Sequence, residues 1–160
     1  GAYATKALKG LTVQASLTYQ NPKYVEFDIF NVATGAVASL KDKKPLRQAN
    51  FMTNLTASYE ANGLDLSLNW SYTGNRYADD ANLFQLDAFN VVSGGIGYTF
   101  PFMQNQSLRL GVHVYNLFYS LGLTEGDPRL STGVDPTQFP YLNARPILPR
   151  RIIFDLTYNL

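Results

Sequence analysis

The chain has 160 residues, 46% of them hydrophobic, and its formal net charge is +1 from 13 basic and 12 acidic side chains. This balance provides no clustered basic surface for nucleic acid, so we predict that nucleic acid is not a partner. No stretch approaches the roughly 20 continuous apolar residues of a membrane-spanning helix, which excludes a helical membrane protein.

Alternation of apolar and polar residues is the main pattern of the chain. The first clear run lies at 11–20, after a short apolar piece at 3–8 and a tight turn at Lys9-Gly10. Its odd-numbered positions are apolar, and its even-numbered positions are Thr, Gln or Ser. A period of two over about ten residues is typical of a strand with one apolar and one polar face.

The middle of the chain repeats this pattern as a hairpin. Residues 51–60 and 64–73 alternate in the same way, and Asn62-Gly63 between them supplies the positive φ angles that a tight hairpin requires. Further alternating runs lie at 88–100, 108–115 and 152–160. We therefore predict an all-β protein of about seven strands, counting the short first piece.

The connections between the predicted strands alternate in length. The short ones lie at 9–10, 61–63 and 101–106, and the longer ones at 27–46, 74–85 and 120–149. Bacterial outer-membrane barrels alternate in this way, with tight periplasmic turns and extended extracellular loops. We therefore expect the short connections on the periplasmic side and the long ones outside the cell.

Alternation alone does not say which face points outward, because a soluble lipocalin-like barrel also alternates but places its apolar face inside. Two features favour a transmembrane antiparallel up-and-down β-barrel: small hydrophilic side chains that suit a wet lumen, and aromatic residues near strand ends. Phe51 and Tyr59 are separated by about 21 Å of membrane height at a tilt of roughly 40°, close to the apolar band of about 25 Å. Leu66 is expected near mid-membrane on the lipid-facing side.

Seven strands should not close a barrel, because single-chain bacterial barrels use an even number of strands and an open edge leaves backbone groups unpaired in lipid. We therefore expect either a further strand hidden near the start or the C-terminal end of a larger barrel. The first alternative is a complete small eight-stranded barrel of about 18 kDa with an adhesin or envelope-structural role.

Five phrases of the sequence resemble those of one protein family. They are ALKGLTV at 7–13, GNRYAD at 74–79, GYTF at 97–100, VYNLF at 114–118 and PRRIIFDLTY at 149–158. The last four resemble the closing strands of TonB-dependent outer-membrane receptors, and the first resembles that family's strand-turn-strand phrase. The likeness covers nearly the whole chain.

The resemblance implies that residues 1–160 are the C-terminal portion of a 22-stranded barrel in the bacterial outer membrane. In that family an N-terminal plug domain occludes the barrel, which imports a scarce ligand such as a siderophore–iron chelate, haem, cobalamin or an oligosaccharide. The implied partners are outer-membrane lipid, the plug, the remaining strands, the ligand, and the TonB complex, which acts through a segment ahead of the plug. No cofactor is implied.

Candidate ligand-contacting residues lie in two of the predicted external loops, where aromatic and charged side chains occur together. An arginine binds an anionic chelate through charge-assisted hydrogen bonds. The candidates are Arg76, Tyr77, Asp79, Asp80, Arg129, Tyr141 and Arg145. A solvated loop tip explains the same composition. Arg150 and Arg151 are expected to anchor the last strand at the outer headgroup boundary.

Catalysis has little support in the sequence. The single histidine, His113, lies mid-strand with lumen parity, and neither cysteine nor a carboxylate-rich sequence cluster lies beside it. We therefore expect His113 to form hydrogen bonds in the lumen. Because no nucleophile-elbow sequence is present, the alternative of an outer-membrane hydrolase is not supported, and we predict a protein that is not an enzyme. The run at 79–82 offers oxygen ligands but lacks the spacing and glycine of a calcium loop.

Overall fold

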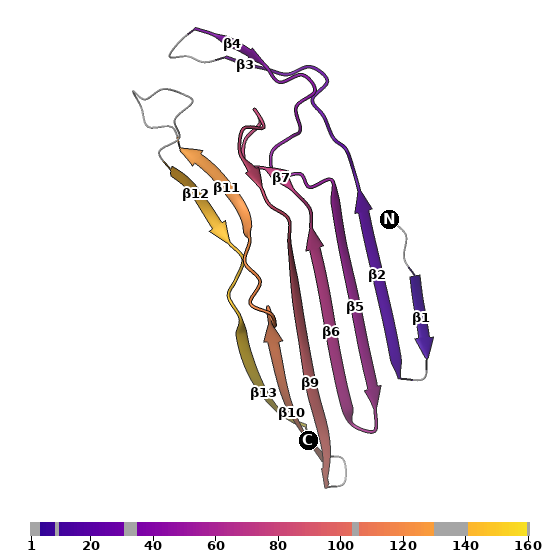
Figure 1. Cartoon of the computed structure of the whole chain (residues 1–160). Helices are drawn as coiled ribbons and strands as arrows, with labels where there is room; N and C mark the ends of the chain where they lie inside the picture. Colours follow the sequence, from indigo (N-terminus) through magenta and orange to yellow (C-terminus); the bar gives the residue numbers. More distant parts are fainter. Residues whose placement is uncertain (1–3, 9, 31–34, 104–105, 130–140, 160) are drawn as a thin grey trace.

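The computed structural model describes residues 4–8, 10–30, 35–103, 106–129 and 141–159. Its main element is one antiparallel sheet of seven strands, which lie side by side in the order of the chain (Figure 1). The strands are β1 (Ala4–Leu8), β2 (Leu11–Tyr19), β5 (Phe51–Ala61), β6 (Leu64–Thr73), β9 (Phe89–Met103), β10 (Gln106–Tyr115) and β13 (Arg151–Asn159). The predicted all-β, up-and-down arrangement is confirmed. Among the described residues, no helix has the length and apolar character needed to cross a membrane.

Each of the three long connections contains a small two-stranded hairpin, which the sequence prediction had treated as loop. The hairpins are β3–β4 (Asp28–Phe30 and Val37–Ser39), β7–β8 (Arg76–Tyr77 and Gln85–Leu86) and β11–β12 (Leu123–Arg129 and Tyr141–Pro146). They lie at one end of the sheet, here called the loop end (Figure 1). The connections from β1 to β2, β5 to β6 and β9 to β10 lie at the other, the turn end. The predicted alternation of long and short connections is therefore confirmed.

Strand β9 is longer than the sequence predicts. The sequence prediction ended this strand at residue 100, before Pro101, which has no N–H for the ladder. The structure continues β9 to Met103, pairs Pro101 with Ser107, and places a register shift between Gln106 and Ser107. Such a bulge accommodates a residue that does not fit the regular ladder, and the connection to β10 is correspondingly shorter than predicted.

The strand register keeps the apolar side chains on one face. One row crosses the sheet from β5 to β13 through Tyr59, Leu66, Ile96, Val112 and Phe154. A slip of one residue in any strand would move its apolar side chains to the polar face, so the alternating sequence fixes the register.

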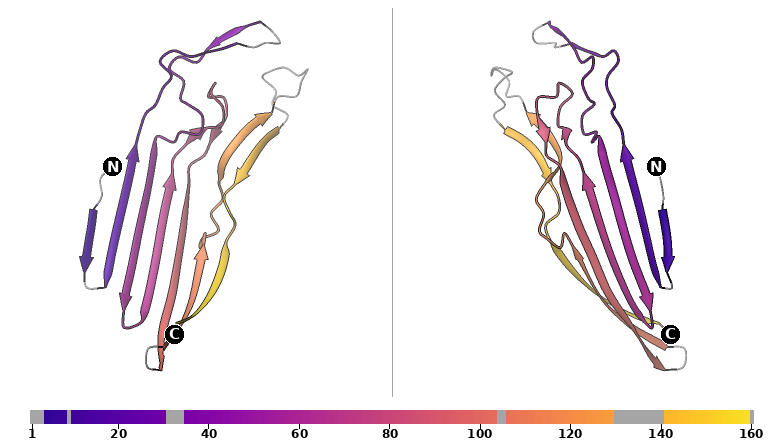
Figure 2. Two further views of the ribbon diagram at one scale, coloured as in Figure 1. Left: turned by 180° about the vertical axis from the view of Figure 1, so that it is seen from behind. Right: turned by 45° about the vertical axis from the view of Figure 1, so that its right-hand side comes forward.

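The sheet is a single layer whose apolar face is widely exposed. Figure 2 shows this layer from two sides, with β1 and β13 at its edges. The exposed fractions are 49% for Leu68, 52% for Ile96 and 76% for Phe154. A water-soluble monomer rarely exposes a continuous apolar face of this extent. The face therefore fits a surface that lipid covers.

Aromatic side chains lie near both ends of the apolar face. Ring pairs form between Phe51 and Tyr72 near the loop end, with centroids 5.8 Å apart, and between Tyr98 and Phe100 near the turn end, 4.6 Å apart. Leu64 is in register with Tyr98, so Leu68 lies halfway between the two aromatic levels along β6. The expectation that Leu66 lies near mid-membrane is therefore shifted by one row, to Leu68.

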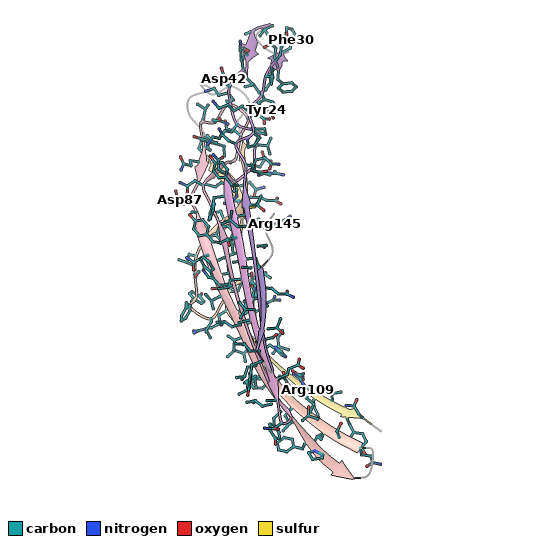
Figure 3. The ribbon with its side chains drawn as sticks, turned by 90° about the vertical axis from the view of Figure 1, so that its right-hand side faces the viewer. Tyr24, Phe30, Asp42, Asp87, Arg109 and Arg145 are labelled. Atoms are coloured by element: carbon teal, nitrogen blue, oxygen red, sulfur yellow. The ribbon has the colours of Figure 1, made fainter. Side chains whose placement is uncertain are left out.

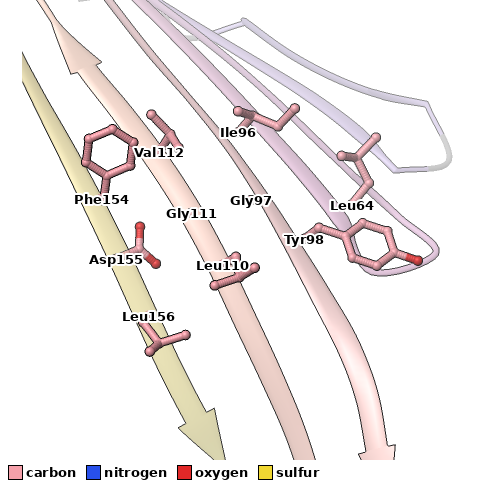
Figure 4. A pocket seen from close by; sticks show the side chains of 10 residues that line it. All are labelled: Leu64, Ile96, Gly97, Tyr98, Leu110, Gly111, Val112, Phe154, Asp155 and Leu156. Carbon is pink, nitrogen blue, oxygen red and sulfur yellow. The ribbon is translucent and has the colours of Figure 1, made fainter.

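Two strand glycines lie between two complete rows of apolar side chains near the turn end. Gly97 and Gly111 are in register on adjacent strands, and a depression of about 500 Å³ surrounds them (Figure 4). Its walls are mainly the apolar side chains of the two neighbouring rows, including Leu110 and Phe154. The same two glycines also shape the opposite face of the sheet.

Candidate functional site

A cluster of charged side chains lies on the polar face near the turn end, and Figure 3 marks its position by Arg109. Arg109 bridges carboxylates from two other strands: its Nη2 lies 2.7 Å from Asp65 Oδ1, and its Nη1 donates to Asp155 Oδ2. The Nε2 of His113 lies 3.1 Å from Asp155 Oδ1. We call Asp65, Arg109, His113 and Asp155 the polar-face cluster. It joins β6, β10 and β13 across β9.

Three glycines make room for this cluster. A Cβ atom on Gly95 would lie 2.3 Å from His113 Nδ1, one on Gly97 would lie 2.4 Å from Arg109 Nη2, and one on Gly111 would lie 2.2 Å from Asp155 Oδ1. These separations are far shorter than van der Waals contact, so only glycine allows the charged side chains to lie flat across the neighbouring strand.

The sequence analysis missed this cluster. It found no carboxylate near His113, because Asp155 comes from a strand that follows a long loop. One feature of the sequence could have indicated it. Glycines occupy positions of β9 and β10 that point to the polar face, where the other strands carry polar side chains. Among the described residues, no group of three or more His, Asp or Glu side chains is arranged to hold a metal ion.

We expect Gly111→Val to destabilise the barrel, because the new side chain displaces the Asp155 carboxylate from Arg109 and His113. Overpacking of this kind costs about 1–3 kcal/mol. Unfolding titrations should measure Gly111→Val alone and combined with Asp155→Ala. The valine should cost less in the combined variant; equal costs in both backgrounds would show that Asp155 is not displaced.

A stripe of neutral polar side chains crosses the polar face between the cluster and the loop end. Asn69 Nδ2 donates to Asn54 Oδ1 at 3.0 Å and to Thr56 Oγ1 at 2.9 Å, and Thr56 Oγ1 donates to Asn54 Oδ1 at 3.2 Å. These amides and hydroxyls suit a wall that faces water or a polar protein surface.

The loop at 74–88, which contains β7 and β8, lies between the other two long loops. On one side, Tyr24 donates a 2.7 Å hydrogen bond to Asp80 Oδ1. On the same side, Asn82 pairs with the backbone of Lys44 in both directions: Lys44 N donates to Asn82 Oδ1 at 2.7 Å, and Asn82 Nδ2 donates to Lys44 O at 2.8 Å. The loop at 20–50 is therefore fixed to this central loop.

Arg76 connects the same central loop to the β11–β12 side. It is 4% exposed and donates to the carbonyls of Gly74, Leu123 and Thr124. Its guanidinium lies over the ring of Phe89, 5.1 Å from the centroid. Burial lowers the pKa of Arg76 from its ordinary value, but arginine starts from so high a pKa that the side chain stays charged.

The pH dependence of the Tyr24 contact follows from its chemistry. The hydrogen bond to Asp80 raises the pKa of Tyr24, because it stabilises the neutral phenol. The contact should be fully present below the ordinary tyrosine pKa of about 10 and lost as the pH rises through the raised value. Difference titration of tyrosine absorbance against Tyr24→Phe should reveal this group. Asp80→Asn should return its pKa toward the ordinary value; an unchanged titration would contradict the assignment.

The remaining predicted site residues occupy different positions. Asp79 accepts hydrogen bonds from the backbone N–H groups of Leu83 and Phe84, so it closes the turn of its own loop. Tyr77 is half-buried, and its carbonyl accepts a 2.7 Å hydrogen bond from Arg47 N. Arg129 and Tyr141 are paired in the β11–β12 register, and their side chains lie outside the described part of the structure.

Arg145 lies in β12 and is largely exposed, with Nη1 3.7 Å from Glu125 Oε1. It lines a polar groove of about 390 Å³ between the β11–β12 hairpin and Arg47 of the first long loop. Here the groove means the space lined by Arg47, Glu125, Gly126, Asp127, Asn143, Ala144, Arg145 and Pro146. The structure therefore brings Arg145 together with Arg47, which the sequence analysis did not select.

A buried amide closes the base of the last long loop. Asn116 is 1% exposed; its Nδ2 donates to Ser120 O at 2.9 Å and Leu148 O at 3.1 Å, and its Oδ1 accepts from Ser120 N at 2.7 Å. The loop therefore leaves and re-enters the sheet at one fixed point. Nearby, the guanidinium of Arg150 lies 5.8 Å from the Tyr119 ring centroid and that of Arg151 5.4 Å from the Tyr115 centroid.

A single-layer antiparallel sheet with one apolar and one polar face, tight turns at one end and long loops at the other, is the wall of a membrane β-barrel. A family model described as TonB dependent receptor-like, beta-barrel, matches residues 2–117. The chain therefore belongs to the TonB-dependent receptor β-barrel family, as the sequence resemblance predicts. This is a family of outer-membrane proteins.

A solved structure supports the same fold. The chain is similar to the siderophore receptor PiuA from Acinetobacter baumannii, with a TM-score of 0.68 and 13% sequence identity. The similarity covers 93% of this chain and 19% of that one, so the chain spans about a fifth of the receptor's length. No curated protein matches the sequence. The sequence predicts that the sheet is part of a larger barrel, and the 19% coverage of the receptor agrees with this prediction.

Proposed function

We propose that this chain is the C-terminal portion of the barrel of an importer in the bacterial outer membrane, which takes up a scarce ligand with energy from the TonB complex. The observation that carries the proposal is the family match over residues 2–117, which include six of the seven described strands of the main sheet, combined with apolar and polar faces that stay in register across it. The remaining strands of a 22-stranded barrel and a plug domain complete the protein. Neither the family nor the solved relative is an enzyme, which supports a non-enzymatic role.

In this proposal, the apolar face contacts outer-membrane lipid and the polar face lines the lumen. The loop end is extracellular, because long loops lie outside and tight turns lie in the periplasm in such barrels. The polar-face cluster then lies on the periplasmic half of the lumen wall.

The loop residues serve the ligand in two ways. Arg145, Arg129 and Tyr141 belong to the β11–β12 hairpin and contact the ligand at the loop end. The loop contacts described above are the main role of Arg76, Asp79 and Asp80. Tyr77 lies between Arg76 and Asp79 in the sequence. A ligand with an anionic group, such as a siderophore–iron chelate, suits the exposed guanidinium of Arg145; haem, cobalamin and oligosaccharides are the other candidates.

Uptake by the full receptor tests this function. Cells that carry or lack the receptor gene, each with and without a working TonB complex, should be given ferric siderophores, haem, cobalamin and maltohexaose in turn. We expect uptake of one ligand class that requires both receptor and TonB. Uptake that is equal in all strains for every probe would contradict import. A native mass of about 18 kDa would instead favour the small-barrel adhesin.

A further inference from the structure

The loop at 74–88 contacts both flanking long loops through different side chains. Toward the first long loop, the contacts are Tyr24 to Asp80, Asn82 to Lys44, and Arg47 N to Tyr77 O. Toward the last long loop, the contact is the guanidinium of Arg76, which donates to backbone carbonyls at Leu123 and Thr124. The loop therefore lies between its neighbours as a bridge, here called the bridge loop.

Apart from the Tyr24–Asp80 bond, these bridge contacts are directed at backbone atoms. Asn82 matches both the N–H and the carbonyl of Lys44, as a neighbouring strand would, and its φ angle of 59° is one that asparagine tolerates better than most residues. The Nη2 of Arg76 donates to the carbonyls of two consecutive residues, and its Nη1, in the same fixed plane, donates to Gly74 O. Contacts of this kind fix the position of a loop and do not depend on the sequence of that loop.

The polar groove lies between the two loops that the bridge loop joins. Its Arg47 wall belongs to the first long loop, and its Glu125, Asn143 and Arg145 wall belongs to the β11–β12 hairpin. The Arg47 backbone is itself bonded to Tyr77, next to Arg76. The width of the groove is therefore set through the bridge loop.

We propose that Arg76 and Asn82 are positioning residues, which hold the two walls of the polar groove at a fixed separation for an anionic ligand group. Arg76 fixes the hairpin wall and Asn82 fixes the Arg47 wall. The inference rests on the proposed import function, because it assigns the groove as a ligand-contacting site. Arg47 and Arg145 line the groove from opposite walls, and Asn143 adds an amide donor. Glu125 and Asp127 line it as well, with Glu125 Oε1 3.7 Å from Arg145 Nη1.

The separation of the two walls is measurable directly. The sequence contains no cysteine, so Lys43→Cys and Asn143→Cys, both at exposed positions, allow two spin labels in the full receptor after removal of other reactive thiols. Pulsed electron paramagnetic resonance should give one narrow distance distribution. Arg76→Gln and Asn82→Ala should each broaden it, whereas Asp87→Asn, an exposed position of the same loop, should not. Unchanged widths in both variants, or equal broadening in the control, would overturn the proposal.

Two further measurements separate positioning from loss of the fold. The melting temperature of the barrel should remain close to that of the unsubstituted receptor, and Arg76→Lys, which keeps the charge but lacks the planar fork, should broaden the distances less than Arg76→Gln. With the ferric complex of a tris-catechol chelator as probe, Arg76→Gln should raise the half-saturating concentration severalfold and leave maximal uptake unchanged. A lower maximal uptake with unchanged half-saturation would contradict positioning.

A failure of the import function and a failure of the bridge loop give different results. If the unsubstituted receptor takes up no probe in a TonB-dependent manner, the import function fails, and the distance distributions still decide whether the bridge loop fixes the groove. If uptake is normal and both variants keep narrow distances, the import function stands and the bridge is wrong.

Discussion

Leu68→Arg should lower the free energy of unfolding by about 2–4 kcal/mol, the cost of an arginine on the lipid face at the bilayer midplane. Leu68 lies on the apolar face of β6, is 49% exposed in the sheet, and is halfway between the two aromatic levels. It packs beside Gly94 of β9, where no side chain shields a new charge from the hydrocarbon. Denaturant titration of the full receptor in lipid vesicles measures the loss.

Ser67→Arg is the matched control for this substitution. Ser67 precedes Leu68 on the same strand but lies on the polar face, in register with Gly95 and Ser58. An arginine there remains among polar groups, so its cost should be much smaller. Equal losses from both substitutions would mean that the two faces are assigned wrongly.

Asn116→Ala should destabilise the protein by about 1–3 kcal/mol, because it leaves the N–H of Ser120 and the carbonyls of Ser120 and Leu148 without their amide partner. The φ angle of Asn116 is 52°, which alanine adopts less readily than asparagine. The same titration measures the effect.

Asn143→Ala provides the comparison, because Asn143 is exposed on β12 of the same long loop. Its removal should change the free energy of unfolding by no more than about 0.5 kcal/mol, as is usual for surface positions. If the two asparagines cost the same, the buried amide does not hold the base of the loop.

The strands, their order and their faces were predictable because one local rule determines them. Alternation fixes which side of β6 is apolar, and the turn at Asn62-Gly63 fixes its register against β5. Pro101 was misjudged, because the strand continues past it: Pro101 pairs with Ser107, next to a register shift at the end of the strand. That tolerance depends on the partner strand, which a local reading does not include.

The contacts of the candidate site were less predictable, because they join residues far apart in the sequence. Arg109 meets Asp65 and Asp155 only through the strand order, because these partners are 44 and 46 positions away in the sequence. Arg76 was selected for its charge and its loop position, whereas the structure places it against carbonyls of another loop. Composition selected these loops as candidates, but it did not indicate which of their side chains form contacts with neighbouring loops.

Contact between membrane lipid and the apolar face of this sheet underlies the whole interpretation. Spin labels placed one at a time along β6, from 64 to 73, in the full receptor in bilayers test this contact. Their collision rates are measured with oxygen, which concentrates in the hydrocarbon, and with a water-soluble nickel chelate. We expect oxygen accessibility to peak at the even-numbered positions and to fall at the odd-numbered ones. Peaks at the odd-numbered positions, or accessibility without a period of two, would contradict this lipid contact.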